Sequence, residues 1–322
     1  MLGLWDLYSR AMRLKADLAS DAVLMLTTLI WGSTFVIVKD VLEQWPPIAY
    51  LTVRFALAAL VLFALFARLV FVSRLREWRA GATLGVLMGG GLALQTMGQV
   101  YTTPAKSAFI TGLTTPLVPF FALFMLRVRP NLENMVGVTL ASIGGLLIVA
   151  PHGEAGINAG DIFTLCATSL FAMHIVLLSV YARENDARQL TVLQIACAAM
   201  LFIGFWVVLR AAGILITGNS LPDFVTRESL KHVWSTRLAW QFVYLTLIAT
   251  VVTFLLWTWG QARASATHAA IIFSLEPVFA TAFAVGVRGR GEWMDALGNF
   301  GAALIVAGVI VSELRLTGSG KK

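Results

Sequence analysis

The chain contains one stretch twice, and this repeat constrains its fold more than any other feature. LQTMGQVYTTPAKSAFI, from Leu94, returns as LWTWGQARASATHAAII, from Leu256. Identical residues stay in one register at an offset of 162 (256 − 94) and, after one residue is dropped, at an offset of 161. The matched pairs include Gln99 and Gln261, Pro116 and Pro277, Arg127 and Arg288, and Gly137 and Gly298. The sequence therefore contains an internal duplication, and each copy is expected to form the same structural unit.

Composition places this duplication in a membrane. Hydrophobic residues make up 58% of the 322 residues and charged residues only 13%, with a mean hydropathy of +0.81. Soluble domains carry about 25% charged residues. The net charge of +7 does not indicate a nucleic-acid partner, because no basic stripe is interleaved with aromatic residues. The basic residues lie in short gaps between apolar runs, as is typical of membrane proteins, so we expect the lipid bilayer to be the chain's environment.

Ten apolar segments follow a helix start at Ser20-Asp21. Most approach the roughly 20 residues that cross the hydrocarbon layer. The segments are 21–39, 47–69, 79–101, 104–126, 132–150, 159–182, 190–211, 238–261, 266–287 and 294–313. The sequence therefore predicts an all-α membrane protein with ten transmembrane helices.

The termini are expected to lie outside this bundle. Residues 1–19 have apolar side chains on one helical face and charged side chains on the other, which favours a short amphipathic helix on the membrane surface over a cleaved signal peptide. Residues 314–322 are expected to form a cytoplasmic tail. More of the lysines and arginines that flank the spans fall on the side of the N-terminus, so both termini are predicted to be cytoplasmic.

The repeat also has an orientation. Segments three to five return as segments eight to ten, so residues 20–150 and 158–313 each form a five-helix repeat. Because five is odd, the second repeat enters the membrane from the opposite side. Inverted repeats recur in secondary transporters, whose substrate sites lie near the midplane between the halves. The duplication therefore predicts a transporter.

Three motifs resemble those of the EamA-type drug/metabolite transporter superfamily. They are IWGSTFVIVK from Ile30, LTVRF from Leu51, and SLEPVFATAFAVGVRGRGEWMDALGNFGAALIVAGVIV from Ser274. The resemblance implies a ten-helix bacterial inner-membrane permease, often an exporter of amino acids or other small metabolites. The family's glutamate before proline maps onto Glu276, and its glycine-glutamate pair maps onto 291–292. Thr115 and Asn131 stand at the matching positions of the first copy.

Polar residues within the spans are the candidates for the substrate site, because such residues are costly in lipid and usually face an interior cavity. Several fall at helical spacing, in stripes that could converge from four helices. Such residues also join helices by hydrogen bonds, which remains the alternative. The candidate substrate-binding residues are Glu276, Gln95, Gln99, Trp257, Gln261, Trp31, Arg54 and His268.

Two kinds of side chain among these candidates have open alternatives. Arg54 lies about two turns into its segment, where it either reaches for the outer surface or turns inward to pair with a carboxylate or an anionic group of the substrate. Trp31 and Trp257 either form a stacking surface for substrate or serve as packing and interface residues. Both questions depend on which way the helices face.

Pro116 and Pro277 lie within corresponding spans. A proline lacks an N–H and frees the carbonyl four residues before it, here at Gly112 and Phe273. Paired helix breaks in two inverted halves indicate a transporter site, so we expect both prolines to contribute to helix breaking and gating. The alternative is that each proline forms an ordinary packing kink.

Glu276 is the carboxylate nearest the middle of any span. An ionised carboxylate at this depth costs roughly 3 kcal/mol or more unless it is paired or hydrated. We therefore predict that Glu276 lines the central cavity and either carries a coupling proton or recognises a substrate amine. The alternative is that it bonds freed backbone groups between helices.

Other classes of function are disfavoured. The chain has no H-E-x-x-H motif, aspartate-rich pair or glycine-rich phosphate loop, so we predict neither an enzyme nor a nucleotide-driven pump, and no cofactor. His174 and His268 lack partners at metal-ligand spacing, so no metal site is expected. One inverted duplication supplies no ring for a channel. The sequence predicts a secondary-active carrier, a monomer or weak homodimer, for a small polar metabolite such as an amino acid; the alternative substrate is a hydrophobic cation or drug.

Overall fold

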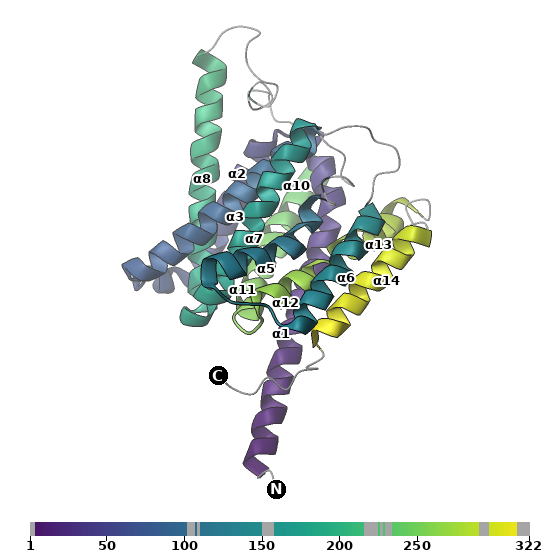
Figure 1. The fold of residues 1–322 in the computed structure, drawn as a ribbon. Helices are drawn as coiled ribbons and strands as arrows, with labels where there is room; N and C mark the ends of the chain where they lie inside the picture. Colours follow the sequence, from purple (N-terminus) through teal and green to yellow (C-terminus); the bar gives the residue numbers. More distant parts are fainter. Residues whose placement is uncertain are drawn as a thin grey trace.

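The computed structural model describes residues 4–101, 107, 110–149, 158–215, 225, 228, 234–289 and 296–313. All regular secondary structure in this part of the chain is helical, as predicted (Figure 1). The helices are α1 (Leu4–Leu42), α2 (Pro47–Phe71), α3 (Leu75–Tyr101), α5 (Thr114–Leu126), α6 (Leu132–Val149), α7 (Ala159–Glu184), α8 (Ala187–Leu215), α10 (Thr236–Val243), the π-helix η1 (Tyr244–Val252), α11 (Thr253–Gln261), α12 (Ala266–Phe273), α13 (Glu276–Arg288) and α14 (Ala296–Glu313).

Seven stretches of the described residues are helical, long and apolar enough to cross a membrane. They coincide with seven of the ten predicted segments. The other three coincide with shorter apolar helices at Ile110–Leu126, Leu132–Leu147 and Ala296–Ser312. Many leucines, valines and phenylalanines remain exposed on the outside of the bundle, as expected where hydrocarbon replaces water as the solvent. The protein is a multi-pass membrane protein.

The helix start expected at Ser20-Asp21 is absent, because α1 is continuous from Leu4 to Leu42. A serine caps a helix when its oxygen accepts a backbone N–H of the first turn. Here Ser20 Oγ instead donates to the carbonyl oxygen of Gly260, 2.8 Å away. No proline or glycine interrupts the chain between residues 4 and 31, so nothing local ends the helix. The N-terminal part of α1 therefore extends beyond the body of the bundle (Figure 1).

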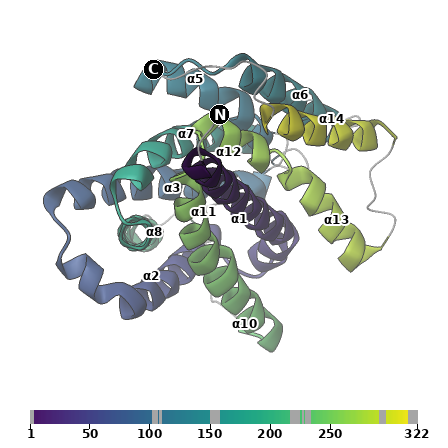
Figure 2. The ribbon, with the colours of Figure 1, turned by 90° about the horizontal axis from the view of Figure 1, so that it is seen from below.

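Helices α6 and α14 lie side by side along one edge of the bundle (Figures 1 and 2). Glycines allow their backbones to approach closely. A Cβ atom on Gly137 would lie 2.8 Å from the carbonyl oxygen of Gly308, and one on Gly144 would clash with the carbonyl of Gly301. Small residues are the usual means of close helix packing in lipid, where hydrophobicity does not drive helices together.

Matched glycines of the duplication make matched contacts. A Cβ on Gly98 would lie 2.6 Å from Thr164 Oγ1, and a Cβ on Gly260 would lie 3.1 Å from Leu24 Cγ. The two glycines differ by 162 (260 − 98), and their partners differ by 140 (164 − 24). Thus α3 packs on α7 in the way that α11 packs on α1.

The same two offsets relate a second pair of contacts. Trp31 Nε1 donates to Thr253 Oγ1 at 3.2 Å. Gly91, which is 162 residues before Thr253, packs closely against the ring of Phe171, which is 140 residues after Trp31. These contacts of α1 and α7 therefore follow the same two offsets as the glycine contacts.

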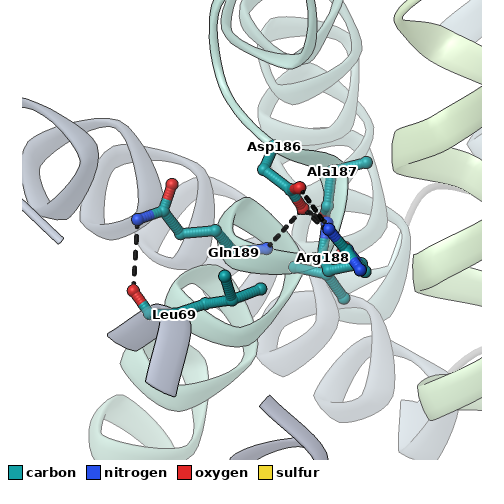
Figure 3. A network of polar contacts seen from close by, with 6 residues as sticks. Leu69, Asp186, Ala187, Arg188 and Gln189 are labelled. Carbon is teal, nitrogen blue, oxygen red and sulfur yellow. Dashed lines mark hydrogen bonds and ion pairs between the residues drawn. The ribbon is translucent and has the colours of Figure 1, made fainter. Parts of the chain in front are cut away.

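A polar network at one end of the bundle joins the last turn of α2 to the start of α8 (Figure 3). Gln189 Nε2 donates to the carbonyl oxygen of Leu69 at 3.2 Å and to Ser73 Oγ at 2.7 Å. Asp186 Oδ2 lies 2.7 Å from Arg188 Nη2. The hydrogen bond from Arg188 lowers the pKa of the Asp186 carboxyl. This network fixes the end of α2 relative to α8.

The other end of α2 is held by Glu228. Its Oε1 accepts the N–H of Ile48 at 2.8 Å and its Oε2 accepts the N–H of Ala49 at 3.0 Å. A carboxylate is favourable at a helix N-terminus because the first N–H groups have no partner within the helix. Burial nevertheless raises the pKa of Glu228 above its ordinary value. The cap anchors the turns of α2 that precede Arg54.

Candidate functional site

Two helices break at matched positions before their prolines. Leu113 forms a turn between the helical residues 110–112 and α5, and its N–H donates to the carbonyl of Ile110 at 3.1 Å. Ser274, which is 161 residues later, follows α12, and its N–H donates to the carbonyl of Ile271 at 3.2 Å. Ser274 N–H also lies 3.1 Å from the carbonyl oxygen of Ala270, so its bond is shared between the i−3 and i−4 carbonyls. After each turn a new helix begins around the proline. The described chain therefore turns three residues before each proline, and the role of the prolines in these turns stays a prediction.

A cavity of about 160 Å³ lies where these breaks meet the centre of the bundle. Helices α1, α2, α3, α5, α7, α11, α12 and α13 contribute to its wall. Seven predicted site residues line it: Trp31, Arg54, Gln95, Gln99, Trp257, Glu276 and Pro277. The structure thus brings together residues that are up to 246 positions apart (277 − 31).

One wall of the cavity is aromatic. The rings of Trp31 and Trp257 meet edge to face, with centroids 4.9 Å apart and an interplanar angle of 89°. Phe273 packs on both tryptophans, at 5.7 Å from Trp31 and 5.6 Å from Trp257. Phe254 completes the cluster, which we call the aromatic wall (Trp31, Phe254, Trp257 and Phe273). Such a surface suits an apolar or cationic group of a ligand.

Glu276 begins α13, directly after the break, and its partly buried side chain faces the cavity. Its carboxylate has no hydrogen bond or ion pair with any residue that the structure describes. At the matched position, Thr115 Oγ1 donates to the carbonyl oxygen of Ala270 at 3.3 Å. The first copy therefore uses this position to join two helices, whereas the second presents a carboxylate to the cavity.

Amides and hydroxyls line the wall contributed by α3 and by the helix leading into α5. Gln95 Nε2 donates to Thr111 Oγ1 at 3.0 Å, and Gln99 lies one turn further along α3. Thr111 and Thr115 lie four residues apart, on either side of the turn at Leu113, and both line the cavity. These groups give the cavity neutral donors and acceptors beside the aromatic wall.

Arg54 points inward and is only 7% exposed, so the alternative in which it reaches the surface is not what the structure shows. Its guanidinium donates from Nη1 to Tyr50 Oη at 2.7 Å and from Nε to Thr250 Oγ1 at 2.8 Å. It also donates to the carbonyl oxygens of Leu245 and Ala249, at 3.2 and 3.0 Å. Three of these acceptors belong to η1, a π-helix that sequence periodicity did not predict.

Gln261 is fully buried behind the aromatic wall and is not among the residues that line the cavity. Its Oε1 accepts the Nε1–H of Trp257 at 3.0 Å, so it fixes the indole of Trp257. The ring of His174 lies against the same indole, with centroids 4.7 Å apart, and its Nε2 lies 3.0 Å from Gln194 Oε1. Sequence reasoning gave these side chains no such supporting role, because their contacts join three separate helices.

His268 also lies away from the cavity lining. Its Nε2 is 3.0 Å from Asp21 Oδ1 and its Nδ1 is 3.2 Å from Ser312 Oγ. These contacts tie α12 to α1 and α14. The residues that the structure describes contain no group of three histidines, cysteines or acidic residues arranged to hold a metal ion.

Pro116 and Asn131, two further predicted positions, do not line the cavity. Pro116 is half-buried at the start of α5 and is not among the cavity-lining residues, although Thr115 is. Asn131 Oδ1 accepts the N–H of Asn134 at 2.9 Å and so caps α6. The glycine-glutamate pair at 291–292 lies outside the described residues.

Comparison with known proteins gives consistent matches. Residues 18–150 and 158–314 match the EamA-like transporter family. An uncharacterized transporter of Archaeoglobus fulgidus is 31% identical over 94% of this chain and 87% of its own length. A Salmonella typhimurium protein named as a probable amino-acid metabolite efflux pump is 24% identical over 89% of this chain and 92% of its own. A solved crystal structure shares the fold with a TM-score of 0.69 and 17% identity, covering 91% of this chain and 96% of that one.

Proposed function

We propose, because this chain belongs to the EamA-like transporter family, that it is a secondary-active carrier of a small polar metabolite. The cavity at the two matched helix breaks is the observation that carries this proposal. Secondary transporters bind substrate near the membrane midplane, where broken helices expose polar backbone and side chains.

The layout that we propose is ten spans in two inverted five-helix repeats, at 20–150 and 158–313, followed by the tail at 314–322. The matched glycine contacts and the matched turns at Leu113 and Ser274 support it. Alternating access then consists of one half rocking against the other around the cavity. We place the protein in the bacterial inner membrane as a monomer or weak homodimer, with both termini in the cytoplasm. We expect no enzymatic activity.

We expect Glu276 either to carry the coupling proton or to recognise an amine of the substrate. Its carboxylate lacks a protein partner among the described residues and faces the cavity, so either a proton or a substrate amine can satisfy it. Pro277 has no N–H to donate to the carbonyl of Phe273, so we expect this carbonyl to offer the substrate another acceptor. Gln95, Gln99 and Arg54 supply the remaining polar contacts.

Amino acids are the first substrate class to test. The cavity combines neutral amides with one acid and one base, and one relative is named as a probable amino-acid metabolite efflux pump. A dianionic substrate would need several basic residues. Hydrophobic cations are the second candidate, because the aromatic wall beside Glu276 has the chemistry that holds a cation.

Topology labelling tests the inverted layout. In a background without Cys166 and Cys197, single cysteines are introduced as Arg127→Cys and Arg288→Cys at matched positions. Opposite-side labelling by a membrane-impermeant maleimide is expected. Labelling of both from one side would contradict the inverted repeat.

Transport by Glu276→Gln in liposomes, over a range of pH, tests the role of this carboxylate. The substitution keeps size and hydrogen bonding while it removes the titratable charge. We expect a slower rate and the loss of the wild-type pH dependence. Glu184→Gln is the matched control, because Glu184 forms an exposed ion pair with Arg76 away from the cavity. Wild-type rates and pH dependence in Glu276→Gln would leave Glu276 as structural.

A further inference from the structure

Among the described residues, the buried charge of Arg54 has no carboxylate partner. All four of its hydrogen-bond acceptors are neutral: two hydroxyls and two backbone carbonyls. The ion pairs formed among the described residues do not include Arg54. Glu276 lines the same cavity, yet it is not paired with Arg54. Taking an unpaired cation out of water costs free energy, so binding of an anionic group beside the guanidinium is strongly favoured.

The guanidinium also retains donors. An arginine has five N–H groups. Nε donates to two acceptors of η1 with its one hydrogen, while Nη1 and Nη2 each donate once. Five minus three leaves two N–H groups, one on each terminal nitrogen, without a partner among the described residues. A carboxylate is the anion that a planar guanidinium binds most readily through two donors.

The π-helix holds Arg54 in this position. In η1 the backbone bonds run from residue i to i+5, a rare arrangement that often occurs at functional sites. Arg54 bonds to η1 at Leu245, Ala249 and Thr250, while Tyr50 supports it from its own helix. The guanidinium is therefore fixed by its neighbours before any ligand arrives, which reduces the entropy lost on binding.

We propose that Arg54 binds a carboxylate of the transported molecule, so that a carboxylate is a requirement for transport. This inference rests on the proposed function and adds a residue that determines specificity. Arg54 lies on α2 and Glu276 on α13, so the cavity presents a cation and a carboxylate from different helices, and neither forms an ion pair with a described residue. The alternative is that Arg54 only ties α2 to η1.

The test uses the purified full chain in liposomes and paired labelled probes. Phenylalanine, leucine and threonine are each compared with their carboxamides, which keep the amine and side chain but lack the carboxylate. The measured quantity is the acid-to-amide ratio of uptake. Wild-type protein is expected to prefer the acids by about tenfold or more, as loss of a charged hydrogen-bonded pair predicts.

Four variants distinguish binding of a substrate carboxylate by Arg54 from a purely structural role of Arg54. Arg54→Gln is expected to bring the ratio close to one, while Arg54→Lys retains part of the preference because it keeps the charge but loses the planar fork. Tyr50→Phe and Thr250→Val each remove one support and keep the cation, so they are expected to slow transport without abolishing the preference. A structural role alone would lower acid and amide uptake together in all four variants.

Three results would overturn the inference. Equal uptake of acids and amides by wild-type protein would remove the carboxylate requirement while leaving the carrier function intact. An unchanged preference in Arg54→Gln would show that another group recognises the carboxylate. Uptake of neither acids nor amides would overturn this inference together with the proposed amino-acid class. If Arg54→Gln fails to fold, the wild-type ratio and Arg54→Lys still decide the question.

Discussion

The two broken helices have the same backbone geometry at the break and different side chains after it. Leu113 has φ −65° and ψ −9°, and its counterpart Ser274 has φ −64° and ψ −11°. Two residues further on, Thr115 bonds to the carbonyl of Ala270, whereas Glu276 faces the cavity without a protein partner among the described residues. The two turns have the same backbone geometry, and only the second is followed by a titratable group at the matched position. The two turns are therefore alike in backbone geometry and differ in the side chain that follows them.

The largest effect is expected when the second break is given the residue of the first. Glu276→Thr should lower transport at least tenfold, about 1.4 kcal/mol in activation free energy, because the carboxylate in the cavity is lost. Initial uptake rates in liposomes, normalised to inserted protein, measure the effect. The comparison between the halves would be wrong if Thr115→Val lowered the rate by the same factor.

Removing either proline should have the next largest effect. Alanine at 116 or 277 restores an N–H that can bond the carbonyl of Gly112 or Phe273 and join the two helix pieces. We expect a several-fold slower turnover, because the joined helix pieces can no longer move separately. Stability is expected to change by less than about 1 kcal/mol, because Pro277 lies in the first turn of α13, where a proline is tolerated. Thermal unfolding and uptake rates measure the two effects.

Similar losses of rate in Pro116→Ala and Pro277→Ala would mean that both breaks flex during transport. A loss in only one variant would identify the moving helix and sharpen the comparison. Faster turnover in both variants would contradict a role of the two breaks in gating.

The two copies also differ at the matched positions 107 and 268. His268 bonds to Asp21 and Ser312, whereas the matched Ser107 Oγ is buried without a hydrogen bond among the described residues. His268→Ser should therefore destabilise the protein by about 1–2 kcal/mol, since it removes two partly buried hydrogen bonds. Unfolding of His268→Ser, Asp21→Asn and the double variant would give a coupling energy of about 1 kcal/mol. Strictly additive changes in the free energy of unfolding would mean that the contact between His268 and Asp21 does not stabilise the protein.

The smallest effect is expected at Thr115. Thr115→Val keeps the shape of the side chain and removes one long hydrogen bond to the carbonyl of Ala270. Bonds of this kind between membrane helices are worth about 0.6 kcal/mol, so stability should change by less than about 1 kcal/mol and transport by less than about twofold. A tenfold loss of transport would mean that the first break also carries chemistry.

The sequence by itself determined the features that are local or periodic. Apolar runs of span length act through neighbouring residues, and they predicted the helical membrane fold. The two prolines lie three residues after the turns at Leu113 and Ser274, and their part in gating stays a prediction. Glu276 and the two tryptophans were identified as candidates because polar or aromatic groups within a span are conspicuous against an apolar background.

Only the tertiary structure decided how those candidates are grouped. Gln261 turns away from the cavity to hold Trp257, His268 bonds to Asp21, and Arg54 inserts among the carbonyls of a π-helix. Ser20 bonds to the carbonyl of Gly260, and α1 continues through the expected start. The lipid solvent is the reason why the sequence does not predict these contacts. In a bilayer, lipid and helix surfaces are equally apolar, so hydrophobic pattern does not specify which face meets which neighbour; close packing and long-range hydrogen bonds do.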